Sequence, residues 1–431
     1  MKQLSLFLLF LSLSLPASAQ KPAQPVLQEG TPASVGVSPD RLARLDRVLQ
    51  QYVDSGQQPG IVALLVRDGK IIYHKSFGQD DVAARTPLRR DAIVRIASQT
   101  KAITSIGLML LFEEGKFLLD DPVSKYIPAF KNVRVLDKLN EKDTTFTTVP
   151  AKREITIQHL LTHTSGISYP VIGGKEFSAI YAKYRIPSGI GTPDGNLADA
   201  ITRLAALPLA HQPGERWTYG LNTDVAGYLI EVLSGQSLSQ FLQTRLFGPL
   251  GMKDTHFYLP ADRQNRLAKL YTEDSTGRIQ PLPARGGLSP DYPKQAGTFY
   301  SGGAGLSSTA YDYAIFLQML LNGGTYNGRQ LLSPATVRMI TSNQIGELSL
   351  GANKFGLGFG LYTDKTQARI GASVGSFDWG GIFGTSYWAD PKEKIVGVLL
   401  TQKYPNTTAR DLNDKFRVLV YQALTSLHES R

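Results

Sequence analysis

A long apolar run from Ile103 to Phe112 places the strongest limit on how this chain can fold. Apolar residues occupy most positions of the run, so a helix formed by it presents an apolar surface on nearly every side. Such a helix is stable in the interior of a globular protein, and the run is too short to cross a membrane. We therefore expect a buried helix around which the other elements are arranged.

Ser98 and Lys101 stand at the entry to this helix and form the pattern Ser-x-x-Lys. Residues three apart lie one turn apart on one face, so the hydroxyl and the amine can approach each other. A serine hydroxyl becomes a good nucleophile when a base takes its proton, and lysine can be that base when burial or a neighbouring charge lowers its pKa. The alternative interpretation is a helix-capping serine beside a solvated lysine, because the pattern alone is frequent by chance.

Length and composition set the class of protein. The chain has 431 residues, 42% hydrophobic and 19% charged, which is typical of a globular protein with one large domain or two intergrown lobes. It has no cysteine, which excludes disulfides, thiolate metal sites and a lipid anchor on cysteine. The net charge of +10 comes from scattered residues, so we expect no nucleic-acid partner.

The first residues predict export. An apolar run at 4–15 is too short to span a bilayer, and the small residues at 17–19 are typical of a signal-peptidase site. We expect residues 1–19 to be a signal peptide that is removed before Gln20. The product would be a periplasmic or secreted bacterial protein without a transmembrane anchor. Residues 20–37, rich in Pro, Gln and Ala, are expected to form an extended leader.

Both ends of the chain predict strands and helices. A helix is expected to begin at Ser38, which is followed by proline, and to end near Gly56. Two apolar runs, 61–66 and 71–73, flank an Asp-Gly pair that favours a hairpin turn. In the C-terminal part we expect three strands and a closing helix, at 355–361, 368–374, 395–400 and 409–427.

Two segments in the middle of the chain have distinctive sequence patterns. Ile155–Gly166 contains His159 and His163, four residues apart, which on a helix could present two metal ligands. No third ligand and no zincin-type glutamate accompany them, so packed, hydrogen-bonded histidines are the favoured interpretation. The second segment, Pro213–Asn222, leads into a helix expected over 223–233.

A fourth pattern completes an ordered set. Ser301–Thr309 is rich in glycine, which suits close backbone packing, and its end is expected to cap a helix over 310–321. Together with the Ser-x-x-Lys pattern and the two segments above, it resembles the serine β-lactamase and penicillin-binding-protein family, in the branch related to class C β-lactamases. The resemblance runs from about Val37 to Leu424.

This resemblance implies a fold. An α+β protein (broadly, α/β) is expected, in which an antiparallel sheet flanked by helices is built from both chain ends. For this chain the family implies one catalytic domain over 38–428. Its sheet lobe would comprise about 38–97 and 295–428, and its inserted helical lobe about 98–294.

The resemblance also implies site residues. Ser98 matches the nucleophile, and Lys101 and Tyr219 match the groups that manage its proton. The backbone N–H groups of Ser98 and Ile382 match the oxyanion hole, whose donors stabilise a transition state by roughly 3–4 kcal/mol each. The substrate would be a small acyl compound, and neither a cofactor nor a metal is expected.

The sequence departs from the family at two places. Leu221 stands where many relatives have asparagine, and Asn222, one residue later, is expected to be a helix N-cap. Trp379, followed by Gly380 and Gly381, stands where relatives carry a lysine or histidine before a glycine. The cation there helps to hold a substrate carboxylate, whereas tryptophan offers an apolar wall and one N–H. This wording resembles the esterase branch of the family.

A rival nucleophile also fits a pattern. Ser373 lies in Gly-x-Ser-x-Gly, the turn that carries the nucleophile in α/β-hydrolases. That fold needs an acid and then a histidine later in the chain, and the one histidine after Ser373 is His428, close to the end. We therefore favour Ser98.

Three functions are open at this point. The first is an exported serine hydrolase that cleaves an ester through an acyl-enzyme on Ser98. The second is a β-lactamase or D-amino-acid peptidase, which would need another cation, such as Arg285 or Arg369, to replace the missing one. The third is a non-catalytic binding protein that retains the fold. The sequence predicts neither the acyl group, the leaving group nor the oligomeric state.

Overall fold

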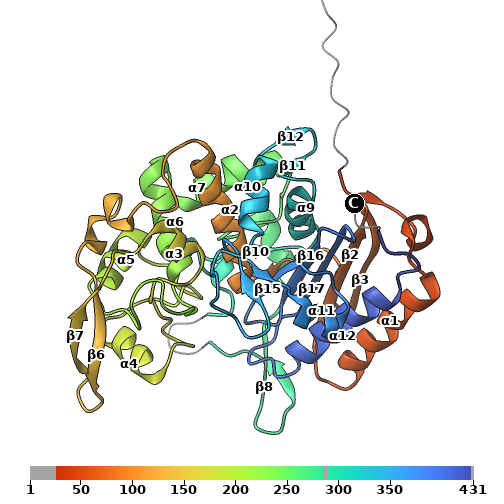
Figure 1. Ribbon diagram of the computed structural model, residues 1–431. Helices are drawn as coiled ribbons and strands as arrows, with labels where there is room; N and C mark the ends of the chain where they lie inside the picture. The colour runs from red at the N-terminus through yellow and green to blue at the C-terminus, as the bar shows by residue number, and fades with distance from the viewer. Residues whose placement is uncertain (1–25, 285–288, 429–431) are drawn as a thin grey trace, which may run out of the picture.

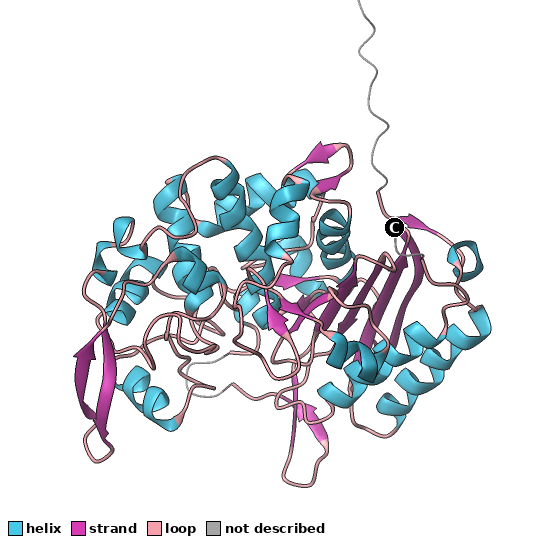
Figure 2. Ribbon diagram, in the orientation of Figure 1, coloured by secondary structure: helices cyan, strands magenta, loops and turns pink. Residues whose placement is uncertain are grey.

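The computed structural model describes residues 26–284 and 289–428. A region built on a sheet lies at one end of the molecule and a helix-rich region at the other (Figures 1 and 2). The predicted signal peptide, residues 1–19, lies outside the described residues, as does part of the predicted leader. The rest of that leader contacts the sheet region, because β1 (Gln28–Glu29) pairs with β3 (Lys70–Asp81) and Leu27 is buried.

The main sheet has nine strands in the described part of the chain. It joins the two ends of the sequence, since β2 (Gly60–Arg67) pairs antiparallel with β17 (Ile395–Leu400). Neighbouring strands are antiparallel except β1 and β3, which are parallel. The strand order is β1, β3, β2, β17, β16 (Ser386–Asp390), β15 (Phe377–Gly380), β14 (Gly360–Leu361) and β13 (Lys354–Phe355), with β4 (Thr86–Pro87) on β3. The predicted antiparallel sheet from both chain ends is confirmed.

Helices cover both faces of this sheet, which explains why β2 is apolar at almost every position. Successive side chains of a strand point to opposite faces. Ile61 and Leu65 pack with the cluster that contains α1 (Pro39–Asp54) and α12 (Ala409–Gln422). The other face, with Val62 and Leu64, packs with the cluster that contains α2 (Thr100–Glu113) and α9 (Ala310–Leu321). A strand buried on both faces has no polar side to alternate with.

The remaining helices and short strand pairs lie outside the main sheet, and most of the helices form the helix-rich region. These helices include α3 (Ile157–Leu161), α4 (Lys175–Lys183), α5 (Leu197–Ala205), α6 (Asn222–Ser234), α7 (Leu238–Leu242), α8 (Gly248–Leu250) and α10 (Pro334–Ile340). Short strand pairs are β5 (Val94–Arg95) with β10 (Ser307–Ser308), β6 (Arg134–Asn140) with β7 (Thr145–Pro150), β8 (Tyr271–Glu273) with β9 (Ile279–Pro281), and β11 (Thr325–Tyr326) with β12 (Arg329–Gln330). Among the described residues no helix combines the length and apolarity that a membrane span requires.

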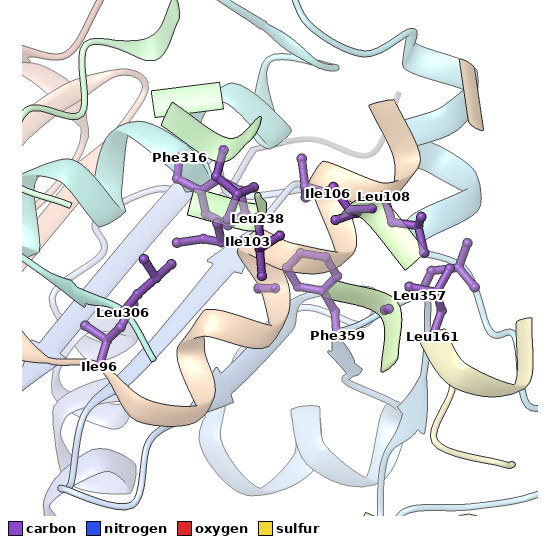
Figure 3. Packing of buried hydrophobic residues seen from close by; sticks show 14 of the residues in the cluster. Ile96, Ile103, Ile106, Leu108, Leu161, Leu238, Leu306, Phe316, Leu357 and Phe359 are labelled. Carbon is purple, nitrogen blue, oxygen red and sulfur yellow. The ribbon is translucent and has the colours of Figure 1, made fainter. Parts of the chain in front are cut away.

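The helix α2 lies between the two regions and is buried, and its apolar sequence predicts the burial. Every residue from Thr100 to Leu111 is buried. Ile103 and Ile106 lie among side chains from several other helices, including Phe316 of α9 and Leu238 of α7 (Figure 3). Ser98 precedes this helix, so the position of the candidate nucleophile is fixed by the largest core of the protein.

One predicted strand is wrong. Residues 368–374 form the end of α11 (Asp364–Ile370) and the turn after it. Thr366 and Ile370, four residues apart, are the buried positions, which is the spacing of one helix face. Gly371 ends the helix in a left-handed conformation, with φ 79°. The helix begins before the predicted strand, and its buried face is formed by Thr366 and Ile370, of which only Ile370 belongs to the apolar stretch.

Candidate active site

A strained turn presents Ser98. The residue lies in a 3₁₀ turn, Ala97–Gln99, between β5 and α2. Ala97 is fully buried and has φ 43°, in the left-handed region that residues other than glycine rarely adopt. Backbone strain of this kind is held in place by surrounding packing and concentrates at functional sites. The turn places Ser98 on the wall of a large cleft, whose volume is about 1000 Å³.

Lys101 lies behind that wall and faces Ser98. Its Nζ is 3.4 Å from Ser98 Oγ and donates a hydrogen bond of 2.8 Å to the carbonyl oxygen of Gly303. The amine is also 4.7 Å from the ring centre of Tyr219 and 5.4 Å from that of Tyr169. The side chain is only 2% exposed. The structure thus brings the predicted serine and lysine together in the buried setting that the sequence indicates.

Tyr219 is held by a group of aromatic rings. Its ring stacks on Tyr169, with centroids 5.8 Å apart and planes at 4°, and on Trp217, with values of 6.0 Å and 18°. Trp379 comes from the other region of the molecule, and its Nε1–H donates to Tyr219 Oη at 3.4 Å. The indole, expected to be an apolar wall, therefore also orients the tyrosine hydroxyl. Tyr219, Trp379 and Ser98 line the same cleft.

Asn222 is not the N-cap that the sequence predicts. It is the first residue of α6, and Leu221 occupies the cap position without a side-chain hydrogen bond. The amide of Asn222 instead accepts a hydrogen bond from Ser165 Oγ and lies 3.0 Å from His163 Nδ1. A local capping preference is overridden here by partners more than fifty residues away in the sequence.

The two candidate histidine ligands have different hydrogen-bond partners. His163 packs its ring 5.0 Å from that of Tyr219, and burial together with the charge of Lys101 lowers its pKa well below the usual value. His159 forms a capping box with Thr156, and burial is the main cause that lowers its pKa to about 4. In the residues that the structure describes, no cluster of three or more His, Asp or Glu side chains is arranged to hold a metal ion.

The stretch Trp379–Gly381 packs directly against the turn that carries Ser98. A Cβ at Gly381 would overlap the carbonyl oxygen of Ile96, two residues before Ser98, so only glycine allows this approach. The turn after Gly381 carries Ile382, whose backbone N–H donates to no other described residue. Ile382 lines the cleft, and the role of its N–H in an oxyanion hole stays a prediction.

The cleft is lined by both apolar and charged side chains. Its apolar lining includes Val171, Ile172, Ile190, Leu282, Phe383 and Tyr404. Its charged lining includes Asp378, Arg410, Asp414 and Arg417. Arg417 belongs to α12, and its buried guanidinium donates to Asp378 Oδ2 at 3.2 Å and to Ser386 Oγ at 3.0 Å. Burial raises the pKa of Asp378, and the charge of Arg417 opposes that rise.

The cations that the sequence suggested as substitutes for the missing one are elsewhere. Arg285 lies outside the described residues, and Arg369 pairs with Asp414 at 3.3 Å, with its side chain 54% exposed. Among the described residues that line the cleft, the cations are Arg410 and Arg417. No motif marks Arg417 in the sequence. Tyr169, which stacks on Tyr219, was also missed, although it follows the wording of Ile155–Gly166 by three residues.

The structure also settles where the rival serine lies. Ser373 follows a helix, α11, and precedes a strand, β15, whereas the α/β-hydrolase turn joins a strand to a following helix. The residue is 5% exposed, its backbone N–H donates to Asp390, and it is not part of the cleft lining.

Comparisons with known proteins agree with this architecture. A sequence model of the Beta-lactamase family matches residues 45–422. Protein Rv1367c of Mycobacterium tuberculosis is 36% identical, over 83% of this chain and 89% of its own length. Esterase EstB of Burkholderia gladioli is 30% identical, over 88% of this chain and 95% of its own.

A solved structure is also similar. EstCE1, described as a hydrolase with promiscuous acyltransferase activity, superposes with a TM-score of 0.75 and 28% identity, covering 89% of this chain and 99% of its own. The family match spans both regions of the molecule and the cleft that Ser98 and Trp379–Gly381 line. This chain therefore belongs to the β-lactamase family and is a serine hydrolase from the esterase-like branch of that family.

Proposed function

We propose that this protein is an exported esterase that cleaves esters of small molecules through an acyl-enzyme on Ser98. The observation that carries the proposal is the pairing of Ser98 Oγ with the buried Lys101 Nζ, 3.4 Å apart, at the wall of a largely apolar cleft. The family's esterase relatives support an ester as the substrate. Export is supported by the sequence pattern of residues 1–19.

The reaction has two halves. Ser98 Oγ attacks the ester carbonyl carbon, and its proton passes to the Lys101 and Tyr219 pair while the oxyanion accepts hydrogen bonds from the N–H groups of Ser98 and Ile382. The alcohol leaves with a proton from that pair, and the acyl group stays on Ser98. Water then attacks the acyl carbon, loses a proton to the same pair, and releases the acid as Ser98 regains its proton.

Trp379 favours a neutral ester over a β-lactam or a peptide carboxylate. An anionic group near the indole would need a cation, because a desolvated charge without a partner costs several kcal/mol. Arg417, close to this strand, already donates to Asp378 and Ser386. Arg410 lies on the exposed side of α12. Neither arrangement reproduces a cation at the position of Trp379.

A substrate panel tests the proposal. Wild type and Ser98→Ala would be assayed with p-nitrophenyl esters, a chromogenic cephalosporin and D-Ala-D-Ala peptides. We expect ester hydrolysis by wild type and a loss of at least about 10³-fold in Ser98→Ala. Faster turnover of the cephalosporin or the peptides than of any ester would favour the β-lactamase or peptidase alternative. No turnover of any compound would favour a binding protein.

Two further measurements test the nucleophile and the export. Peptide mapping after a fluorophosphonate should place the adduct on Ser98, and an adduct on Ser373 would replace the proposed nucleophile. Expression of the full chain in a bacterium, followed by fractionation, should yield a product outside the cytoplasm whose first residue is Gln20. A product that retains residues 1–19 in the cytoplasm would contradict export.

A further inference from the structure

Asp224, on the first turn of α6, is a buried carboxylate that uses only one of its oxygens. Oδ1 accepts hydrogen bonds from Ser301 Oγ at 2.6 Å and from the backbone N–H of Gly303 at 3.2 Å. Oδ2 is also buried, yet it has no hydrogen-bond partner among the described residues. A buried carboxylate oxygen without a partner is costly, so its presence here calls for a compensating interaction.

The compensating group lies on the other side of Gly303. A Cβ at Gly303 would overlap Asp224 Oδ2 and would stand 3.4 Å from Lys101 Nζ. The carboxylate oxygen and the ammonium therefore flank the same glycine. The space between them is open because Gly303 has no side chain. The carbonyl of this glycine accepts from Lys101 while its N–H donates to Asp224. One residue thus links the carboxylate and the amine by hydrogen bonds at both ends. Burial raises the pKa of Asp224, and the charge of Lys101 together with the hydrogen bonds from Ser301 and Gly303 opposes that rise.

The other titratable groups near this amine do not supply a negative charge. Tyr169 and Tyr219 present their ring faces to Lys101. Burial raises the pKa of Tyr169 well above its usual value, and burial with the charge of Lys101 lowers the pKa of His163, so both are neutral near pH 7. The N-terminal end of a helix favours an anion, which suits Asp224 in the first turn of α6.

We propose that Asp224 is a positioning residue that balances the charge of Lys101 across Gly303 and holds the carbonyl to which Lys101 donates. The inference rests on the proposed function only in that Lys101 exchanges protons with Ser98. The two hydrogen bonds of Gly303 keep the amine of Lys101 aimed at Ser98. We expect the negative charge of Asp224, acting on that amine, to affect the pH dependence of the reaction at Ser98.

The test is the pH dependence of Ser98 labelling by a fluorophosphonate, compared between wild type and Asp224→Asn. Asparagine keeps the shape and the acceptor oxygen but removes the charge. We expect the acid limb of the labelling rate to move to lower pH by about one unit or more, because a unit charge at this range in a protein interior has an effect of that size. The plateau rate should fall about tenfold, because the amine becomes a weaker base.

Ser301→Ala is the matched control. It removes one hydrogen bond to Asp224 and leaves the charge, so it should lower the melting temperature while the acid limb stays where wild type has it. If Asp224 has only a structural role, both variants should melt at a lower temperature. The acid limb of the labelling rate should then lie at the wild-type pH in both. That result, or an equal movement of the limb in Ser301→Ala, overturns the proposal.

A second comparison covers the case in which Asp224→Asn does not fold. Removing one charge of a buried pair is more damaging than removing both, because the second charge is left without a partner. The double variant Lys101→Met/Asp224→Asn should then fold and melt at a higher temperature than Asp224→Asn. A double variant no more stable than Asp224→Asn overturns the proposal. If wild type is labelled at Ser98 but hydrolyses no ester, the esterase function fails while the pH comparison still decides the role of Asp224.

Discussion

Lys101 connects the residues of the site more tightly than the spacing in the sequence suggests. Its amine lies near Ser98, the carbonyl of Gly303 and the ring of Tyr219, and these three residues come from segments that are far apart in the sequence. Groups that share one proton through a common neighbour do not contribute independently to a rate.

Substitutions at Lys101 and Tyr219 should therefore be strongly non-additive. Lys101→Ala and Tyr219→Phe are each expected to lower kcat/KM for a p-nitrophenyl ester by about 10²–10⁴-fold, the usual contribution of general acid–base help. The double variant should fall little below the worse single variant. Circular dichroism would establish that each variant is folded. Wild-type rates in folded Lys101→Ala would remove the lysine from the mechanism.

Trp379 has two roles that substitutions can separate. Trp379→Phe keeps an aromatic wall but removes the N–H that donates to Tyr219 Oη. We expect it to lower kcat for neutral esters by about fivefold to tenfold, with KM nearly unchanged, because a hydrogen bond of this kind contributes about 1 kcal/mol. A change in KM alone would show that the indole acts only by contact with the substrate.

Trp379→Lys tests selectivity at the same position. A lysine there supplies the cation that carboxylate-binding relatives carry, so kcat/KM for carboxylate-bearing β-lactams should rise relative to neutral esters. The ratio of the two activities would be measured in wild type and variant at one salt concentration, since charge effects depend on ionic strength. An unchanged ratio would mean that another part of the cleft sets the preference.

At the scale of elements, one turn controls the apolar mouth of the cleft. The segment from Tyr169 to Gly173 is closed by a hydrogen bond from the Gly173 N–H to the Tyr169 carbonyl, and a Cβ at Gly173 would overlap that same oxygen. The turn holds Val171 and Ile172 at the cleft with 55% of each side chain exposed. Exposed aliphatic residues held by a fixed turn are expected to contact an apolar substrate group.

The double variant Val171→Ser/Ile172→Ser should therefore change chain-length preference. We expect kcat/KM for p-nitrophenyl octanoate to fall about tenfold or more and that for the acetate to stay within about twofold, because only the longer chain reaches these side chains. Val374→Ser, at a valine that is 49% exposed and outside the cleft lining, is the matched control. Equal losses for both esters would contradict the assignment of this mouth to the acyl chain.

The elements differ in how much the sequence predicted. The buried helix α2 and the pairing of Ser98 with Lys101 followed from a local apolar run and a three-residue spacing, both of which survive folding. The hydrogen bonds of Asn222 could not be predicted in this way, because its partners His163 and Ser165 are distant in the sequence. Their contacts outweigh the local preference of asparagine for a helix N-cap. The prediction of a strand at 368–374 was wrong, because a short apolar stretch fits both the period of a strand and that of a helix.

At the scale of the whole molecule, the order of the motifs predicted the fold, and the charged lining of the cleft stayed hidden. Arg417 meets Asp378 only because α12 returns to the sheet, and nothing near Arg417 in the sequence indicates that contact. The sheet itself joins β2 to β17, and side chains of both chain ends pack together in the cluster between this sheet and the helices α1 and α12. A substitution that weakens the packing of α12 should therefore lower the stability of the whole sheet.

Phe416→Ala tests this coupling. Phe416 is 1% exposed and packs edge-on to Trp388, with ring centroids 5.2 Å apart. Deleting a buried phenyl ring typically lowers the free energy of unfolding by about 3–5 kcal/mol. Since domains are stable by only about 5–15 kcal/mol, urea unfolding followed by circular dichroism should show a much lower midpoint.

Leu427→Ala, at a leucine that is 68% exposed beyond the end of α12, is the control and should change the free energy of unfolding by less than about 0.5 kcal/mol. Because β2 and β17 share one sheet, Phe416→Ala should unfold in a single transition rather than lose α12 alone. Fluorophosphonate labelling of Ser98, followed across the same urea series, should disappear together with the circular dichroism signal. Labelling that persists after the sheet signal is lost would show that the helical region around Ser98 keeps its structure without the sheet.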